Sequence, residues 1–198
     1  MSAKIRVCVY CGSAPGANPR HAEAARRLGR AMAEGGVGLV YGGGDLGLMG
    51  ETARAVLEAG GEVTGIIPAF LQRRERMLED AQRVIVVPDM HTRKRMMFEE
   101  ADAFVALPGG IGTLEELVEQ MTWAQLGRHT KPVILADLDG FWRPLLALLD
   151  HMRAEGFIRA GMDVSYSVVS DVDEILPTIL RERAAREGQA KETIDPRL

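Results

Sequence analysis

The sequence has few lysines, and it has no long apolar or basic stretch. Only four of its 24 basic residues are lysines, and with 28 acidic residues the 198-residue chain carries a formal net charge of −4. This charge balance does not favour binding to a nucleic-acid polymer or to an anionic membrane surface. No apolar run approaches the roughly 20 residues of a membrane span, and residues 1–9 lack the apolar region of a secretory signal. We therefore expect a cytoplasmic protein without nucleic-acid or membrane partners.

Cysteine is also scarce, and the two cysteines, Cys8 and Cys11, form a C-x-x-C sequence. The residues around them are typical of a strand, in which positions three apart point to opposite faces. A thioredoxin-like site would place the pair at the start of a helix, and no second Cys or His pair completes a set of zinc ligands. We interpret both thiols as buried structural groups, and we expect neither a metal nor a cofactor.

Glycine, in contrast, is abundant, with 22 glycines against nine prolines. Short apolar runs alternate with segments of helical period, which is typical of parallel strands covered by helices on both faces. We predict a single α/β domain over residues 1–186, with a Rossmann-like, doubly wound, mainly parallel sheet, followed by a flexible tail over residues 187–198. The predicted strands are residues 5–10, 38–41, 63–67, 84–87, 103–107, 133–136 and 164–169, and the predicted helices are residues 21–34, 48–59, 92–101, 113–126, 141–153 and 173–186.

Ligands of such a sheet bind beyond the carboxyl ends of its strands. One long connection leaves this edge between the third and fourth predicted strands, over residues 68–83. It is rich in charge, with Arg73, Arg74, Glu75 and Arg76 in sequence. We interpret it as a lid-like connection.

A first glycine-rich loop follows the strand predicted over residues 38–41. It contains G-x-G-x-x-G at Gly42, Gly44 and Gly47, with Gly43 between them. A dinucleotide-binding fold would place an acidic residue at the end of the next strand, where this chain reads GIIP. The loop instead indicates an anion held by backbone N–H groups at a helix N-terminus; a tight turn with close helix–strand packing is the alternative.

A second loop of this kind, with Gly109, Gly110 and Gly112, lies between the strand predicted over residues 103–107 and the next helix. Two such loops at neighbouring strand ends favour a phosphate-sized pocket. Thr113 and Glu116 also fit a capping box, with Thr113 at the N-cap and Glu116 at N3, which needs no function to explain it. The pattern alone leaves both interpretations open.

Three cations, Arg93, Lys94 and Arg95, fall in the first turn of the helix predicted over residues 92–101. Each opposes the helix dipole there at a cost of a few tenths to about 1 kcal/mol. A bound anion would offset that cost, and the planar fork of arginine suits phosphate. The alternative is a solvated basic face. We interpret His91, just before them, as a structural histidine.

The helix predicted over residues 113–126 has an apolar stripe that leaves Glu116, Glu119 and Trp123 on the opposite side. A tryptophan in that position suggests a subunit interface. The stripe consists of Leu114, Leu117, Val118, Met121 and Gln125.

These motifs occur together in one order: the glycine loop over residues 42–50, MHTRK over residues 90–94, and PGGIGTLEE over residues 108–116. With CVYCGS over residues 8–13 and TWAQLG over residues 122–127, they resemble the LOG family. Its members are cytokinin riboside 5′-monophosphate phosphoribohydrolases and are often mislabelled as lysine decarboxylases. The resemblance covers about residues 8–132.

The resemblance implies hydrolysis of the N-glycosidic bond of an adenosine 5′-monophosphate, with or without an N6 modification, to the free base and ribose 5-phosphate. It places the catalytic arginine on Arg93 and the catalytic glutamate on Glu116, and it implies a homodimer with the active site near the interface. Its substrate-binding positions fall on Glu75, Lys94, Gly110, Ile111, Gly112, Thr113, Leu114, Glu115 and Thr122, and the two glycine loops, with Gly42, Gly43, Gly44, Gly47 and Gly109, would hold the 5′-phosphate.

Two other functions compete with this one. A non-catalytic nucleotide or molybdenum-cofactor carrier protein would have a similar fold and similar glycine loops. Lysine decarboxylation fits poorly, because a pyridoxal phosphate enzyme needs a Schiff-base lysine and only Lys94 lies beside a candidate site. The base preference is not set by the motifs: Met49, Met90, Met96, Met97 and Met121 could line a slot for a prenyl group or belong to the core.

Overall fold

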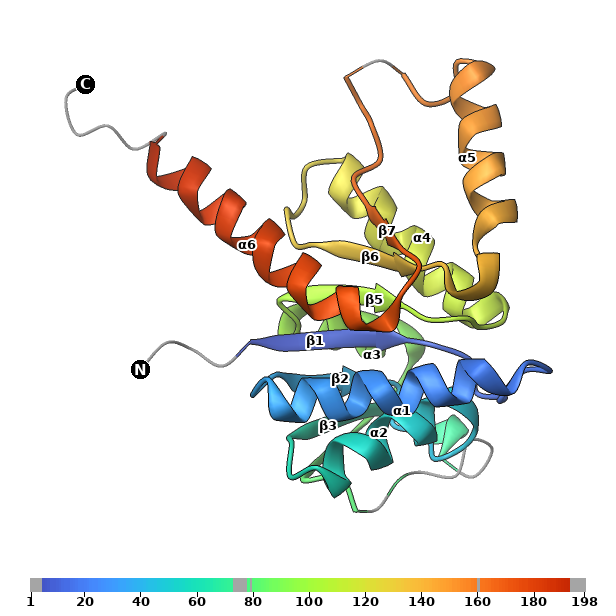
Figure 1. Cartoon of the computed structure of the whole chain (residues 1–198), viewed down its shortest axis with the longest axis vertical. Helices are drawn as coiled ribbons and strands as arrows, with labels where there is room; N and C mark the ends of the chain where they lie inside the picture. The colour runs from blue at the N-terminus through green and yellow to red at the C-terminus, as the bar shows by residue number, and fades with distance from the viewer. Residues whose placement is uncertain (1–4, 73–77, 79, 160, 193–198) are drawn as a thin grey trace.

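The computed structural model describes residues 5–72, 78, 80–159 and 161–192 of the chain. The described residues form one seven-stranded sheet in which each strand runs parallel to its neighbours. The strand order is β4-β3-β2-β1-β5-β6-β7 (Figure 1). The strands are β1 (Arg6–Tyr10), β2 (Gly38–Tyr41), β3 (Val63–Pro68), β4 (Arg83–Val87), β5 (Ala103–Ala106), β6 (Val133–Ala136) and β7 (Ser167–Val169).

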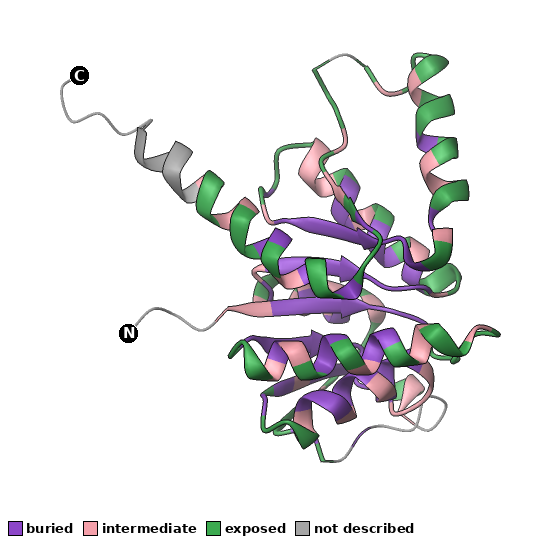
Figure 2. Ribbon diagram, in the orientation of Figure 1, coloured by how far each residue is buried: buried purple, intermediate pink, exposed green. Residues whose placement is uncertain are grey.

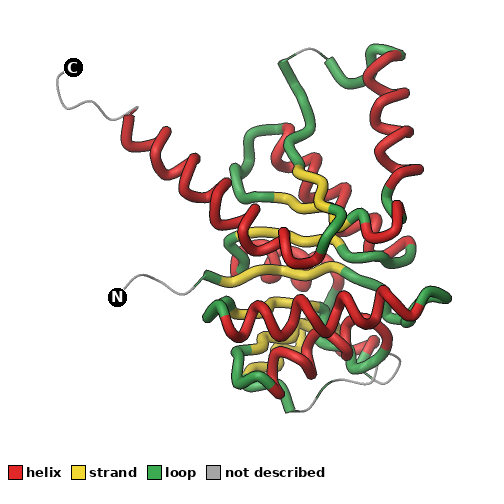
Figure 3. The backbone as a smooth tube through the Cα atoms, viewed as in Figure 1, coloured by secondary structure: helices red, strands yellow, loops and turns green. Residues whose placement is uncertain are grey.

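Six α-helices of the described chain lie on the two faces of this sheet, three on each; Figure 3 shows helices on both sides of the strands. One face is covered by α1, α2 and α6, and the other by α3, α4 and α5. This is the three-layer, doubly wound architecture that the sequence predicts. The helices are α1 (Pro19–Glu34), α2 (Gly47–Glu58), α3 (Met90–Glu100), α4 (Ile111–Gln125), α5 (Arg143–Ala154) and α6 (Ile175–Glu192).

Alternate residues of the central strand β1 enter the cores on opposite faces of the sheet. Val7 and Val9 belong to the core beneath α1, α2 and α6, whereas Cys8 and Tyr10 belong to the core beneath α3, α4 and α5. Figure 2 shows the resulting continuous burial of the central strands. Because β1 is covered on both sides, its residues are apolar almost without interruption.

The two cysteines follow the same alternation. Cys8 and Cys11 are both buried and free, and they lie in the cores on opposite faces of the sheet. Burial raises the pKa of both thiols above the ordinary value. The interpretation of C-x-x-C as two separate structural cysteines is therefore confirmed.

The predicted elements differ from the structure mainly at their ends. β7 begins at Ser167 rather than at residue 164, and the connection over residues 68–83 contains the short 3-10 helix η1 (Ala69–Leu71) and the start of β4. The last helix continues to Glu192, so the predicted boundary at residue 186 falls inside α6. The sequence there, EGQAKE, has one glycine and no proline, and good helix formers extend the helix.

The order in which the chain adds strands to the sheet changes direction between β1 and β5. It builds β2, β3 and β4 outward on one side of β1, and then returns to place β5 on the other side. The loops that leave β1 and β5 therefore diverge toward opposite faces, which opens a crevice at the carboxyl edge of the sheet. Both loops are tied together at this point, because Gly12 N donates to Pro108 O at 3.0 Å.

Candidate active site

A cavity of about 400 Å³ opens beside the carboxyl ends of β1 and β5, within the size range of small-molecule sites. We call it the active-site cavity. Its wall comes from the β1–α1 loop, the start of α2, η1, the start of α3 and the first turns of α4. The lining residues are Cys11, Ser13, Met49, Leu71, Met90, Arg93, Gly110, Ile111, Gly112, Thr113, Glu115 and Glu116.

Arg93 reaches this cavity from α3 and is held by backbone carbonyl groups. Its Nε donates to Ile66 O at 3.1 Å and its Nη2 donates to Gly42 O at 3.3 Å. The residue is only 6% exposed. Because Ile66 lies in β3 and Gly42 directly follows β2, the sheet itself fixes the plane of the guanidinium. Its remaining nitrogen, Nη1, lies 3.8 Å from Oε1 of Glu116.

Glu116 comes from the second turn of α4 and is 9% exposed. A buried charge is tolerated only when it is paired, and Arg93 supplies a positive charge at ion-pair distance. The separation of 3.8 Å is too long for a hydrogen bond. The structure thus brings together the two residues predicted to be catalytic, and both line the active-site cavity.

The start of α4 corrects one prediction. The helix begins at Ile111 and its N-cap is Gly110, with no side-chain cap hydrogen bond, so Thr113 occupies N3 and Glu116 lies beyond the capping positions. The capping box is therefore wrong. The first N–H groups of a helix have no partner within the helix, and among the described residues no side-chain cap occupies them here, so they remain able to bind an anion.

The second glycine loop approaches α4 closely at Gly109. A Cβ built on Gly109 would lie 2.2 Å from Oγ1 of Thr113, whereas a Cβ on Gly110 or Gly112 would meet nothing within 4 Å. Gly109 is thus needed for packing. Gly110 and Gly112 keep the backbone open toward the cavity, which suits the close approach of a ligand.

The first glycine loop has a packing role in the structure, which was the alternative interpretation. Gly43 and Gly47 have positive φ angles of 80° and 59°, and a Cβ on Gly47 would lie 2.3 Å from the backbone of Ser13. Two N–H groups in the first turn of α2 already have a protein partner, because Leu48 N and Met49 N donate to Gly12 O at 2.9 and 3.4 Å. None of the four glycines predicted to hold phosphate here, Gly42, Gly43, Gly44 and Gly47, lines the active-site cavity.

The predicted basic cluster is dispersed in the structure. α3 begins at Met90 with Asp89 as its N-cap, so the three cations fall in the second turn rather than the first. The ammonium of Lys94 contacts Glu115 at 2.5 Å and Glu119 at 2.9 Å on α4. Burial lowers the pKa of Lys94, but its hydrogen bonds to these carboxylates outweigh that effect and raise the pKa.

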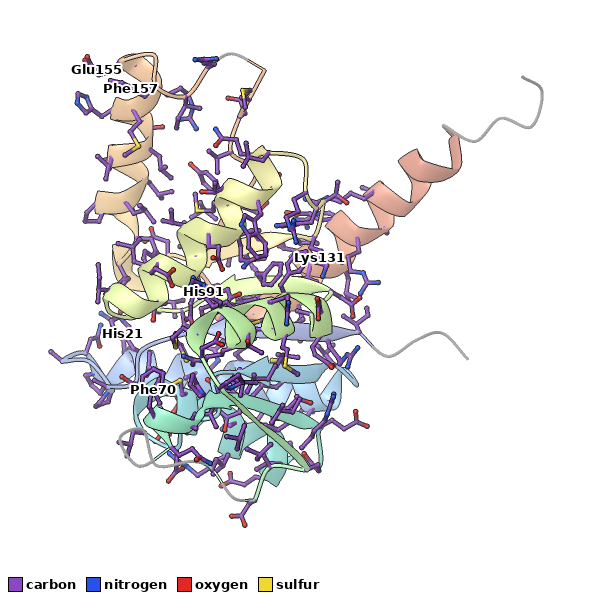
Figure 4. All side chains as sticks on the ribbon, turned by 180° about the vertical axis from the view of Figure 1, so that it is seen from behind. His21, Phe70, His91, Lys131, Glu155 and Phe157 are labelled. Atoms are coloured by element: carbon purple, nitrogen blue, oxygen red, sulfur yellow. The ribbon has the colours of Figure 1, made fainter. Side chains whose placement is uncertain are left out.

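Lys94 therefore joins α3 to α4 and does not line the active-site cavity. Arg95 is exposed, as is His91. Figure 4 shows His91 toward the same edge of the molecule as His21 and Phe70, with Lys131 at the opposite edge.

Two further predicted positions, Leu114 and Thr122, lie away from the active-site cavity. Leu114 packs on the core beneath α3, α4 and α5, and Thr122 is exposed and donates its hydroxyl to Val118 O at 2.7 Å. Neither lines the active-site cavity. Glu75 lies outside the described residues. Gly110, Ile111, Gly112, Thr113 and Glu115 do line the cavity.

The apolar stripe predicted on α4 is wrong in two places. Val118 is exposed, whereas Glu116 is buried together with Gln120. Trp123 is partly buried, with its ring edge-to-face against Phe98 at 5.1 Å. The buried side of α4 includes Glu116, which faces Arg93 on the sheet side. A prediction from apolar residues alone places this carboxylate on the exposed side.

Several lining residues were not predicted, above all Ser13, Leu71 and Cys11. Ser13 could have been found, because it follows the first predicted strand at the carboxyl edge of the sheet. Leu71 lies in a connection whose fold the sequence pattern does not specify.

Within the described part of the chain, no group of three or more His, Cys, Asp or Glu residues is placed to hold a metal ion. No helix there combines the length and apolarity needed to cross a membrane.

Comparisons with known proteins relate the chain to one family. Residues 49–179 match the family model described as a possible lysine decarboxylase. The chain is 52% identical over 153 residues to the cytokinin riboside 5′-monophosphate phosphoribohydrolase LOG of Oryza sativa subsp. japonica, which covers 77% of this chain and 63% of that protein. It is also 52% identical over 153 residues to LOG7 of Arabidopsis thaliana, with 77% of this chain and 70% of that protein covered.

The match thus spans less than two thirds of the rice protein. Among solved structures, the molybdenum cofactor carrier protein of Chlamydomonas reinhardtii has a TM-score of 0.68 at 22% identity, covering 92% of this chain and 99% of that one. A likeness at this identity shows the fold alone. The extent and the identity of the sequence matches show more: the chain belongs to the LOG family, to which the description "possible lysine decarboxylase" is attached.

Proposed function

We propose that the protein hydrolyses the N-glycosidic bond of an adenosine 5′-monophosphate, with or without an N6 modification, and releases the free base and ribose 5-phosphate. The observation that carries this proposal is the buried pair of Glu116 and Arg93, which lies in the wall of a cavity next to the uncapped N-terminus of α4. Curated relatives at about half identity are named for the same reaction.

The 5′-phosphate is best placed on the backbone at residues 110–113. The N–H groups of the first turn of α4 point to the same end of the helix, and its dipole favours a negative charge there. Gly110 and Gly112 leave room for close approach. This placement uses only the second glycine loop, since the first loop packs against Arg93 and Ser13.

Glu116 is the group best placed to act at C1′ of the ribose. Breaking the bond from C1′ to the base develops oxocarbenium-like charge on the sugar, and a carboxylate stabilises that charge and orients the attacking water. Water supplies the hydroxyl at C1′, and the departing base takes the bonding electrons and a proton. Arg93, fixed by Ile66 and Gly42, pairs with Glu116 and orients the sugar–phosphate.

The base then lies against the apolar part of the same cavity. Met49, Leu71 and Met90 contribute that part of the wall. Flexible methionine side chains adapt to ligands of different shape, so they suit a base with a substituent at N6. Of the five methionines that the sequence leaves open between slot and core, this proposal uses Met49 and Met90, and Met49 also packs in the core beneath α1, α2 and α6. Met97 and Met121 belong to the core on the other face, and Met96 packs against it.

We also propose a homodimer in which the active site lies near the interface. α4 exposes Ile111 and Val118, Leu126 is exposed directly after its last residue, and α5 exposes Leu148 and Met152. Both helices cover the same face of the sheet, because Leu117 of α4 and Leu149 of α5 share one core. Exposed apolar side chains gathered on neighbouring helices mark an interaction surface. Ile111 belongs both to this surface and to the active-site cavity.

A substrate panel tests the proposed reaction. We expect release of free base and ribose 5-phosphate from AMP or from N6-isopentenyl-AMP, and little from GMP and CMP. Glu116→Gln keeps the volume of the side chain and removes its charge, so kcat should fall by roughly 10²–10⁴-fold. Circular dichroism checks that the variant folds.

Two results would contradict the proposal. One is the absence of base release from every nucleotide in the panel, together with a tightly co-purifying ligand, which would support the carrier function instead. The other is near wild-type activity in a folded Glu116→Gln variant.

A further inference from the structure

A second cavity, of about 220 Å³, lies next to the active-site cavity on the side of α1. We call it the apolar cavity. It shares Ser13 and Gly110 with the active-site cavity, and its apolar side chains include Pro15, Leu48 and Phe141. The two cavities therefore meet beside the backbone that we propose for the 5′-phosphate.

The apolar cavity is not built for a second phosphate. No lysine or arginine lines it. The backbone groups at its base bond to one another: Gly12 N donates to Pro108 O at 3.0 Å, and Leu48 N donates to Gly12 O at 2.9 Å. An anion would lose its hydration there and would meet no side chain of permanent positive charge among the described residues, since His21 is the one basic side chain in the described lining.

Phe141 gives the apolar cavity an aromatic surface. It is 38% exposed, although its neighbour Trp142 is buried and donates its indole N–H to Ala106 O at 3.2 Å. The Phe141 ring stands edge-to-face against Trp142 at 5.0 Å and against His21 at 5.8 Å. These contacts fix the ring while leaving part of it open, and such rings favour an aromatic partner in a stacked or T-shaped arrangement.

We propose that the apolar cavity is a second subsite, which takes an aromatic group esterified to the 5′-phosphate, so that nucleoside 5′-phosphodiesters are also substrates. The inference rests on the proposed function, because it uses the phosphate position. Base and ribose occupy the active-site cavity, the phosphate lies at Gly110, and the ester group enters the apolar cavity. Water adds across the bond from C1′ to the base, and the phosphodiester stays intact.

The test compares adenine release from AMP, its methyl phosphodiester and its phenyl phosphodiester. The two esters carry the same charge and differ in the group that would enter the apolar cavity. We expect kcat/KM for the phenyl ester to exceed that for the methyl ester by at least about tenfold, from the apolar surface buried by the ring. Phe141→Ala should bring this ratio close to one, and Phe141→Leu should give an intermediate ratio.

Phe157→Ala is the matched control. Phe157 is an exposed aromatic residue beyond the end of α5 that lines neither cavity, and Figure 4 shows it well apart from His21, which lines the apolar cavity. Its removal should therefore leave the ratio unchanged. A ratio of one in the wild-type protein, or an unchanged ratio in Phe141→Ala, overturns the subsite while adenine release from AMP still upholds the proposed function. No base release from either AMP or N6-isopentenyl-AMP overturns both.

Discussion

At the scale of single residues, the position of Arg93 depends on a glycine rather than on a second charge. Gly42 accepts a hydrogen bond from Nη2 of Arg93, and a Cβ built on Gly42 would lie 2.0 Å from that nitrogen. Gly42→Ala should therefore push the guanidinium out of its plane. We expect kcat/KM to fall by at least about tenfold, since a displacement of about 1 Å at a catalytic group has effects of this size.

A double-mutant cycle separates this effect from general damage to the loop. A lysine at position 93 lacks the planar fork that meets Gly42 and Ile66. If the alanine acts through Arg93, then Gly42→Ala combined with Arg93→Lys should be no less active than Arg93→Lys alone. Additive losses would show that Gly42 acts in another way.

His129 carries a pH dependence of stability. It is buried beside Phe98 and Phe104, its Nδ1 accepts the N–H of Lys131 at 3.1 Å, and its Nε2 lies 3.1 Å from Gln120 O. This geometry defines a neutral ring with its proton on Nε2. Burial lowers the pKa of His129; the hydrogen bond to Gln120 opposes this shift, and the Lys131 cation adds to it.

The folded protein therefore binds a proton at His129 less readily than the unfolded chain does. The free energy of unfolding should decrease as the pH falls below the ordinary histidine pKa of 6.5. Urea unfolding at about pH 7.5 and about pH 5.5 measures this loss, and His129→Gln, which does not titrate, should lose less. An equal loss in the variant would assign the pH dependence to other groups.

At the scale of elements, the sequence pattern predicts which segments form strands and helices better than where the helices begin. The run of alternating apolar segments marks all seven strands, because buried parallel strands need nearly continuous apolar residues. The starts of α3 and α4 each come two residues earlier than predicted. At α4, the favourable capping pattern of Thr113 and Glu116 is overridden, because Glu116 forms a buried pair with Arg93.

The two glycine loops show why a motif does not fix its own role. Both follow a strand and precede a helix, and the sequence gives them the same interpretation. In the structure, neither α2 nor α4 has a side-chain cap, but at the start of α2 the N–H groups of Leu48 and Met49 donate to Gly12 O in the β1–α1 loop. The difference comes from the β1–α1 loop: its Gly12 carbonyl accepts from the start of α2, whereas its contact with the second loop is made through Pro108, before α4 begins. That contact depends on tertiary packing between segments more than 30 residues apart, which no local pattern contains.

At the scale of the whole molecule, the site depends on the order of the strands. Arg93 hydrogen-bonds to β3 and to the loop after β2, Glu116 comes from the helix after β5, and Ser13 follows β1. These segments meet because β1 lies between β2 and β5. The sequence predicts the doubly wound class, and the resemblance supplies Arg93 and Glu116. Neither gives the apolar cavity, which forms between a loop, a helix start and Phe141.

The face covered by α4 and α5 also decides how the molecule assembles. Val118 of α4, one of the apolar residues proposed for the dimer interface, is 42% exposed. Leu180 of α6, which lies on the opposite face of the sheet, is 48% exposed. We expect the wild-type protein to be a dimer in analytical ultracentrifugation, and Val118→Glu to be largely monomeric because a buried, unpaired carboxylate is costly. Leu180→Glu, the matched control, should remain dimeric.

The same variants test whether the active site needs the partner subunit. If it does, Val118→Glu should also lose activity at concentrations where Leu180→Glu keeps it. A monomeric wild-type protein, or a dimeric Val118→Glu variant, would rule out this interface.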